Sequence, residues 1–154
     1  MRQLIIRPAD FDRDALAIIE GAKDFAQRVS FRSVFRTGED FIKDISRIVT
    51  LPGLNILLAE SRECIVGGIG ILFVPYVWNP TRLAAEELFF WTSVNAPFKT
   101  ARLLCDTAMN KIEELKAIPM FRRLHNSPKG ITKLYEKRYK LWELETVYTR
   151  LPWL

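Results

Sequence analysis

A chain of 154 residues, 49% of them apolar, is long enough for one domain with a full-sized core and leaves little room for a second. It has no low-complexity run and no apolar stretch near the roughly 20 residues that a membrane-spanning helix needs, so disordered, fibrous and membrane-spanning classes are excluded. The formal net charge of +5 suits an anionic ligand or polymer and does not choose between them.

The two cysteines, Cys64 and Cys105, lie inside apolar segments. We therefore expect small buried side chains in a reducing compartment. Because His125 is the one histidine and no paired Cys or His motif occurs, the sequence predicts no metal site. The N-terminus meets charge after three apolar residues, so no signal peptide is expected and the predicted location is the cytoplasm.

The first predicted elements are one strand and two helices. A short strand covers residues 3–8, where a proline ends it. Apolar residues then recur at helical spacing over 10–29 and again over 37–50. Asp10 or Asp12 can cap the first of these helices.

Three strands follow in quick succession over 55–61, 64–75 and 83–93. A polar turn joins the first two, and a turn through 78–82 joins the second and third. Strands that are linked by hairpins in this way predict an antiparallel meander.

The remaining predicted elements are a helix, a strand, a short helix and a strand, over 100–115, 119–126, 130–139 and 142–151. A helix between strands 83–93 and 119–126 implies a parallel crossover beside the meander. The fold class is therefore α+β in a single domain, 1–154, with a mixed, mostly antiparallel central sheet flanked by helices. The order of elements is β-α-α-β-β-β-α-β-α-β.

The connection between strand 83–93 and helix 100–115 is a candidate anion site. A strand, a tight turn and a helix start form a common anion cradle, because free backbone N–H groups point outward at the helix entry. Such cradles usually carry glycines, and "SVNAPFKTARLL" (93–104) has none. The turn is either a phosphate site with altered chemistry or the relic of one.

Three segments resemble the GNAT acetyltransferase superfamily. They are "LIIRPAD" (4–10), "AAEELFFWTSVNAPFKTARLL" (84–104) and "KLYEKRYKLWELETVYTRL" (133–151). The order of elements is also similar, so the resemblance covers nearly the whole chain. It implies a GNAT-like fold, acetyl-CoA as co-substrate, and an amine acceptor that is a small molecule or a protein. The aromatic fourth strand also looks like short acetyltransferases of tailed bacteriophages.

The resemblance assigns the turn to the coenzyme A loop, whose family pattern is Q/R-x-x-G-x-G/A. Ala101 fits the last position, whereas Lys99 and Ala96 stand where Gly and Gln or Arg are usual. The Lys99 charge, with the amides of Thr100, Ala101 and Arg102, is expected to bind phosphate. A solvated lysine in a degenerate loop is the alternative.

The resemblance also implies a kinked fourth strand that leaves a slot for the acyl-pantetheine arm. Trp91 and Thr92 are then expected to offer backbone groups to the cofactor. Glu86 and Glu87 are adjacent on a strand, so their side chains point to opposite faces and at most one faces the slot. Glu87 is the candidate general base, and an exposed edge or a structural ion pair is the alternative.

Tyr135 matches the tyrosine of the family's "LYEK" segment, which can protonate the departing coenzyme A thiolate. A phenol is protonated at neutral pH and can serve as that acid. The alternative is a tyrosine that only packs against the core.

The sequence thus predicts an acyl-CoA-dependent N-acyltransferase that works by direct attack of an amine on the thioester. The rival interpretation is a GNAT-fold binding protein that has lost catalysis. A basic nucleic-acid-binding module is the third, with charge in its favour and no recognisable motif. No membrane partner is expected, and a homodimer is one of the assemblies left open.

Overall fold

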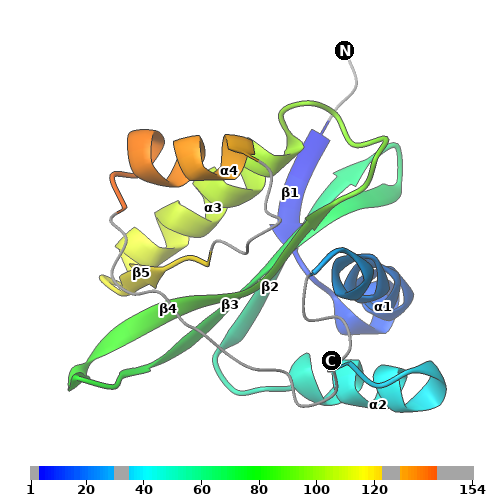
Figure 1. Ribbon diagram of the computed structural model, residues 1–154, viewed down its shortest axis with the longest axis horizontal. Coiled ribbons are helices and arrows are strands. Elements are labelled where there is room, and N and C mark those ends of the chain that lie inside the picture. The colour runs from blue at the N-terminus through cyan, green and yellow to red at the C-terminus, as the bar shows by residue number, and fades with distance from the viewer. Residues whose placement is uncertain (1–3, 30–34, 123–128, 142–154) are drawn as a thin grey trace.

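The computed structural model describes residues 4–29, 35–122 and 129–141, which form a sheet between two layers of helices (Figure 1). The sheet has five strands in the order β1-β2-β3-β4-β5. These are β1 Leu4–Pro8, β2 Leu54–Ser61, β3 Cys64–Tyr76, β4 Asn79–Thr92 and β5 Ile118–Met120. β1 to β4 are antiparallel neighbours, and β4 pairs with β5 in parallel. The mixed sheet of an α+β fold is confirmed.

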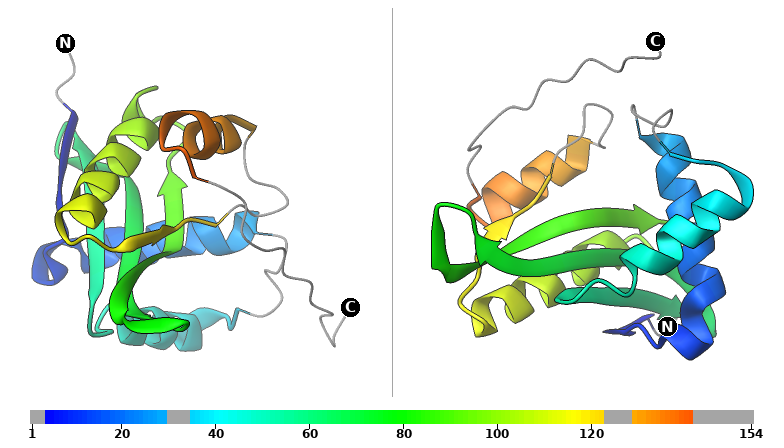
Figure 2. Two further views of the ribbon diagram at one scale, coloured as in Figure 1. Left: turned by 90° about the vertical axis from the view of Figure 1, so that its left-hand side faces the viewer. Right: turned by 90° about the horizontal axis from the view of Figure 1, so that it is seen from below.

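The helices cover both faces of the sheet (Figure 2). They are α1 Phe11–Arg28, α2 Gly38–Ile48, α3 Thr100–Glu114 and α4 Lys129–Lys133, and α4 continues into one π-helical turn, η2 Leu134–Arg138. One core cluster joins the sheet to α3, α4 and η2, and a second joins it to α1 and α2. No helix in the described part of the chain is long and apolar enough to cross a membrane.

α1 is tied to β1 by a partly buried ion pair between Arg7 and Asp14. Asp10 caps the helix and accepts a hydrogen bond from the Asp12 amide. One turn later, Asp14 accepts two bonds from the Arg7 guanidinium, at 2.6 and 2.9 Å, and a third from the Asp10 amide at 2.8 Å. Only 3% of Asp14 is exposed. The first strand and the first helix are therefore held at a fixed angle.

Several predicted boundaries need correction. The β3–β4 turn is at Val77 and Trp78, and residues 79–82 belong to β4. Tyr76 pairs with Asn79, and the preceding residue of β3, Pro75, pairs with Leu83. Residues 80–82 therefore have no partner on β3 and bulge out of the ladder. Their sequence resembles that of a turn, which explains the predicted boundary. β5 ends at Met120, earlier than predicted, and residues 123–126 of the expected strand lie outside the described residues. The last predicted strand, 142–151, also lies outside them.

The helix predicted over 130–139 is a short α-helix, Lys129–Lys133, that continues into one π-helical turn, Leu134–Arg138. The interpretation of both cysteines as buried is wrong for Cys64, which is exposed beside the β2–β3 turn, whereas Cys105 is buried on α3. Both thiols are free.

Candidate active site

β4 and the edge strand β5 are paired over only a short stretch. β4 pairs with β5 only over Ala84–Glu86 and Ile118–Met120. β4 then continues to Thr92, and no other described strand pairs with that side of it. Glu87 is thus the first residue past the point of separation. The ladder between β4 and β5 thus ends before residues 88–92, where the sequence predicts that the two strands separate.

A β-bulge lies at this point. Ile71 of β3 pairs with Glu87 and Gly70 pairs with Phe89, which leaves Leu88 without a partner. After such an extra residue, each side chain points to the face opposite to the one that regular alternation would give it. Ala85 and Glu87 therefore face α3 and η2, as Phe90 does after the bulge, while Phe89 faces α1 and α2.

The two predicted catalytic side chains meet in the structure. Tyr135 is brought there by η2, and its phenol donates a 2.7 Å hydrogen bond to the Glu87 carboxylate. Both residues are 6% exposed. The ring of Phe121 packs edge-on against Tyr135, with centroids 5.1 Å apart. Glu86, by contrast, points away and accepts a hydrogen bond from Arg122, as the opposite-face argument requires.

Burial changes the acid strength of this pair. Desolvation raises the pKa of Glu87 to about 7, against the opposing effects of the Tyr135 hydrogen bond and the Arg122 charge. Desolvation, with the charge of Glu87 and its hydrogen bond, raises the pKa of Tyr135 far above the usual range. On α3, burial and the nearby Glu87 raise the pKa of Cys105 to about 12. A carboxylate that titrates near neutrality is suited to accept a proton from a substrate.

The π-turn is anchored to α3 by Asp106, a residue that the sequence analysis missed. The Asp106 carboxylate accepts two hydrogen bonds from Arg138, at 2.8 and 2.9 Å, and one from the Tyr139 phenol at 2.7 Å. The Arg138 bond, followed by that of Tyr139, holds the pKa of Asp106 below its usual value against the effect of burial. An aspartate in the middle of a helix, between Cys105 and Thr107, was the available signal, because helix interiors disfavour it.

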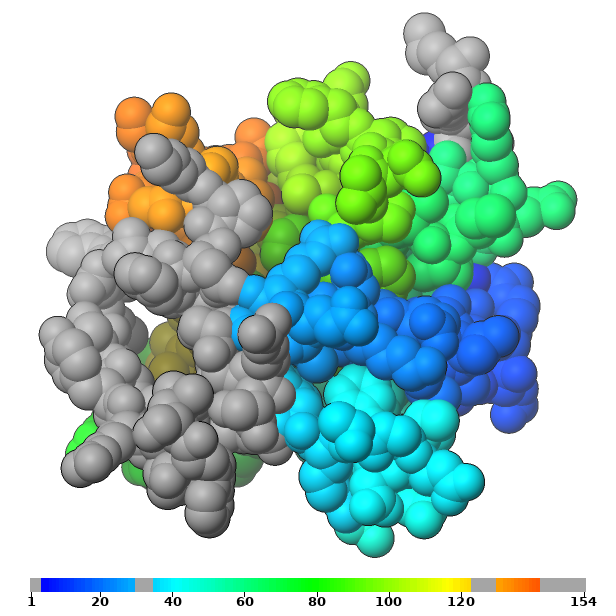
Figure 3. All heavy atoms as spheres, turned by 45° about the vertical axis from the view of Figure 1, so that its right-hand side comes forward, coloured from blue at the N-terminus to red at the C-terminus, as the bar shows by residue number. Residues whose placement is uncertain are grey.

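The expectation for Trp91 and Thr92 needs adjustment. The Ser93 amide donates to the Val66 carbonyl of β3. In an antiparallel ladder every second residue has its backbone N–H and C=O directed at the neighbouring strand. The backbone groups of Trp91 therefore point toward β3, and those of Phe90 and Thr92 point toward the unpaired side of β4. The Thr92 carbonyl already accepts a 3.3 Å bond from Arg28 at the end of α1. Figure 3 shows the end of α1 against the connection from β4 to α3. Phe90 is therefore better placed than Trp91 to offer an amide.

The predicted coenzyme A loop has a tight internal structure. Both the amide and the hydroxyl of Thr100 donate to the Pro97 carbonyl, at 2.9 and 2.7 Å, and Thr100 is 1% exposed. Its expected phosphate contact is therefore corrected, since its donors are used within the turn. The amides of Ala101 and Arg102 donate to no described residue, because the next helical bond is from Leu103 to Lys99.

Lys99 is exposed and has a φ of −85°. No residue from Ser93 to Thr100 has a positive φ. The absence of glycine in this loop therefore causes no backbone strain.

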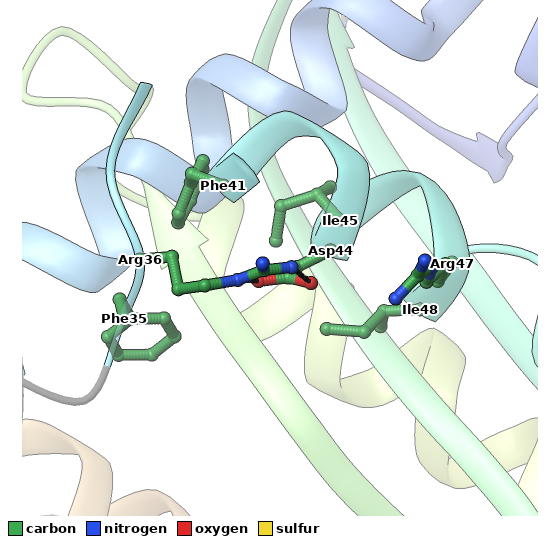
Figure 4. A pocket seen from close by; sticks show the side chains of 7 residues that line it. All are labelled: Phe35, Arg36, Phe41, Asp44, Ile45, Arg47 and Ile48. Atoms are coloured by element: carbon green, nitrogen blue, oxygen red, sulfur yellow. Dashed lines mark hydrogen bonds and ion pairs between the residues drawn. The ribbon is translucent and has the colours of Figure 1, made fainter. Parts of the chain in front are cut away.

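Two hollows mark the described surface. One, of about 360 Å³, lies on α2 at the opposite face of the sheet from Glu87 (Figure 4). It is lined by Phe35, Arg36, Phe41, Asp44, Ile45, Arg47 and Ile48. The other is an open, basic hollow of about 560 Å³ over α4 and η2. It is lined by Gly130, Lys133, Leu134, Lys137 and Arg138. Neither hollow is lined by Glu87 or Tyr135.

Comparison with solved structures identifies the fold. A ribosomal-protein-alanine N-acetyltransferase from Brucella melitensis biovar Abortus 2308 has a TM-score of 0.76 at 19% identity, over 97% of this chain and 98% of that one. A transcriptional regulator from Bacillus halodurans C-125 has 0.75 at 17%, over 97% and 100%. A predicted acetyltransferase with acetyl-CoA from Clostridium acetobutylicum has 0.68 at 15%, over 97% and 96%.

No protein-family model matches the chain, and no curated protein matches its sequence. At these identities the similarity establishes the fold, which is that of the GNAT acetyltransferases.

Proposed function

We propose that this protein is an acyl-CoA-dependent N-acyltransferase that transfers an acetyl group from acetyl-CoA to an amine. The observation that carries the proposal is the buried Glu87–Tyr135 pair at the point where β4 leaves β5. The fold supports it, since acetyltransferases with the same fold cover nearly all of this chain. The acceptor is a small molecule or a protein.

In the proposed reaction the amine attacks the thioester carbonyl directly. Glu87 acts as general base, because its raised pKa lets it take a proton from the acceptor near neutral pH. Tyr135 acts as the acid that protonates the thiolate. The outward-turned amide of Phe90 stabilises the oxyanion or holds the pantetheine arm, since it lies beyond the bulge on the open side of β4.

The β4–α3 loop is the proposed site for the coenzyme A phosphates. The amides of Ala101 and Arg102 lie at the start of α3, where backbone N–H groups attract an anion. Lys99 and Arg102 add positive charge, and both are exposed. Thr100 serves a different purpose, because its bonds to Pro97 fix the shape of the turn.

We also propose that the enzyme works in the cytoplasm. Cys64 is an exposed free thiol, which is compatible with a reducing compartment. The similarity to bacteriophage acetyltransferases stays a prediction from the sequence.

A binding protein without catalysis is the second candidate. The observation in its favour is the glycine-free loop, in which Pro97 has no amide hydrogen and the Thr100 amide is already used.

Calorimetric titration of the full chain with acetyl-CoA tests the proposal. Binding at micromolar concentration, together with thiol release when primary amines are added, is the expected result. Absence of binding at millimolar ligand contradicts the proposed function and favours the binding protein. Tight binding of double-stranded DNA that weakens steeply with salt would instead favour the nucleic-acid module.

A further inference from the structure

The Glu87–Tyr135 contact suggests more than two independent catalytic groups. The acid and the base of an acyl transfer are usually assigned separate protons, yet here the candidate acid donates its only proton to the candidate base. The distance is 2.7 Å and both side chains are buried, so water does not separate them. We propose that Glu87 and Tyr135 form a two-residue proton relay, in which the proton taken from the acceptor amine replaces the proton given to the leaving thiolate.

Tyr135 is a poor acid while Glu87 carries its charge. Burial raises the phenol pKa, and the Glu87 charge and hydrogen bond raise it further. A thiol has a pKa of about 8.5, so transfer of a proton from such a phenol to a thiolate is uphill. Protonation of Glu87 removes the negative charge beside the phenol and lets the carboxylic acid donate to the phenolate. Tyr135 therefore becomes an effective acid only after Glu87 has taken a proton.

The steps balance without a proton from solvent. The amine nitrogen forms a bond to the thioester carbon, and its proton goes to the Glu87 carboxylate. The carbon–sulfur bond breaks with its electron pair on sulfur, which takes the phenol proton of Tyr135. The protonated Glu87 then gives its proton to the phenolate across the existing hydrogen bond. The products are an amide and free thiol, and both side chains return to their starting states.

Three titratable groups near the pair, Cys105, Tyr139 and Asp106, keep their protonation states near neutral pH. Arg122, which bonds to Glu86, lowers the pKa of Glu87 slightly through its charge. Cys105 of α3 stays a thiol, since its pKa is raised to about 12. Tyr139, the residue after η2, stays a phenol because its pKa is raised as well, and Asp106 of α3 stays a carboxylate bound to Arg138. Among the described residues packed there, Glu87 is the group that changes charge near pH 7.

Four versions of the full chain test the relay: the parent, Tyr135→Phe, Glu87→Gln and the double variant. The relay rests on the proposed function, so acetyl-CoA affinity is measured for each version by calorimetry alongside kcat. Each single variant is expected to lower kcat about 100-fold or more, with affinity changed less than about twofold. The double variant is expected to be no slower than the slower single variant, because either change breaks the same relay. If the fold-decrease in kcat of the double variant equals the product of the two single decreases, the relay is overturned.

A shorter acid gives a second readout. Glu87→Asp keeps a carboxylate that can act as a base and withdraws it from the phenol. The relay predicts a loss of kcat close to that of Glu87→Gln, whereas a separate base predicts kcat near the parent, which would overturn the proposal. Tyr76→Phe removes a phenol at the end of β3, away from Ile71 where that strand pairs with Glu87, and should lower kcat less than about threefold. A parent that binds no acetyl-CoA overturns the proposed function and the relay together; binding and turnover with multiplying losses overturn only the relay.

Discussion

Gly21 of α1 and the indole of Trp91 in β4 are in contact so close that a β-carbon on residue 21 would lie 2.2 Å from the Trp91 ring. Gly68 of β3 lies on the other side, where a β-carbon would be 3.1 Å from the indole nitrogen. Trp91 is thereby enclosed between a helix and a neighbouring strand. This contact fixes the distance of α1 from the open side of β4.

Gly21→Ala should lower the free energy of unfolding by about 1–3 kcal/mol, because the added methyl group overpacks the contact with the buried indole. Gly130→Ala is the matched control. A β-carbon at position 130 in α4 meets no atom within 4 Å, so that variant should gain about 0.4–1 kcal/mol. Urea unfolding of both variants measures the difference.

A smaller ring at position 91 should restore part of the loss. Trp91→Phe combined with Gly21→Ala is expected to be more stable than the sum of the two single changes predicts, because the residues are in direct contact. Additive losses would show that the Gly21 effect arises elsewhere.

Glu87→Gln should increase stability at pH 8 and change it little at pH 5. Burial raises the pKa of Glu87 from 4.5 to about 7, so the folded protein binds a proton that the unfolded chain releases between these values. The free energy of unfolding therefore falls as pH rises from about 4.5 to about 7, by on the order of 3 kcal/mol. Glutamine has no charge to bury and can still accept the Tyr135 bond.

The comparison is made by urea unfolding of parent and variant at both pH values. Glu86→Gln is the control, since the neighbouring carboxylate lies on the other face and pairs with Arg122 at the surface. Its effect should stay below about 1 kcal/mol. A Glu87→Gln variant that is less stable than the parent at pH 8 would contradict the burial argument.

Asp14→Asn should show the opposite dependence on pH. The Arg7 hydrogen bonds, opposed by burial and aided by the Asp10 amide, hold the pKa of Asp14 well below its usual range. Its stabilisation is therefore present above the unfolded pKa of about 3.9 and is lost as pH falls through the lower folded value. At pH 7 the variant should lose about 1.5–3 kcal/mol, because the charged hydrogen bonds from Arg7 to Asp14 are lost while Arg7 keeps its bond to Glu60.

The loss should shrink in acid, when the parent carboxyl is itself protonated. Thermal unfolding from pH 7 to pH 3 measures this trend. Asp12→Asn changes an exposed acid in the same helical turn and should show neither the large loss nor the trend. An equal loss for Asp14→Asn at every pH would exclude an ionic contribution.

The sequence predicted the fold because apolar residues recur at helical or strand spacing over long segments. Such a pattern specifies a helix or a strand whichever individual side chains form it. It also predicted that Glu86 and Glu87 face opposite ways, since alternation is a local property of any strand. The resemblance supplied Tyr135. What neither argument predicted is that Tyr135 would bind Glu87.

That contact lies beside one local irregularity and inside another. The bulge at Leu88 inserts one residue into β4, and the π-turn of η2 widens the helix by one residue per turn. The spacing of apolar residues over a whole strand or helix does not show where a single extra residue is inserted. The same bulge explains why Phe90, rather than the predicted Trp91, has backbone groups on the open side.

Lys99 tests whether the glycine-free loop binds coenzyme A. Lys99→Ala should weaken acetyl-CoA binding by about 1–2 kcal/mol, as expected for a charge-assisted contact that is partly solvated. Calorimetry at low and high salt measures the change, and added salt should narrow it. Lys111→Ala, at the other end of α3 and paired with Glu114, is the control and should leave the affinity unchanged.

Lys99→Gly separates the two explanations of the loop. If lysine blocked a cradle that needs glycine, this variant would bind acetyl-CoA more tightly than the parent. The backbone argues otherwise, because Lys99 already has a φ of −85° and glycine would relieve no strain. The variant loses the charge and makes the start of α3 less ordered. We therefore expect Lys99→Gly to bind at least as weakly as Lys99→Ala, and tighter binding would identify the loop as a relic.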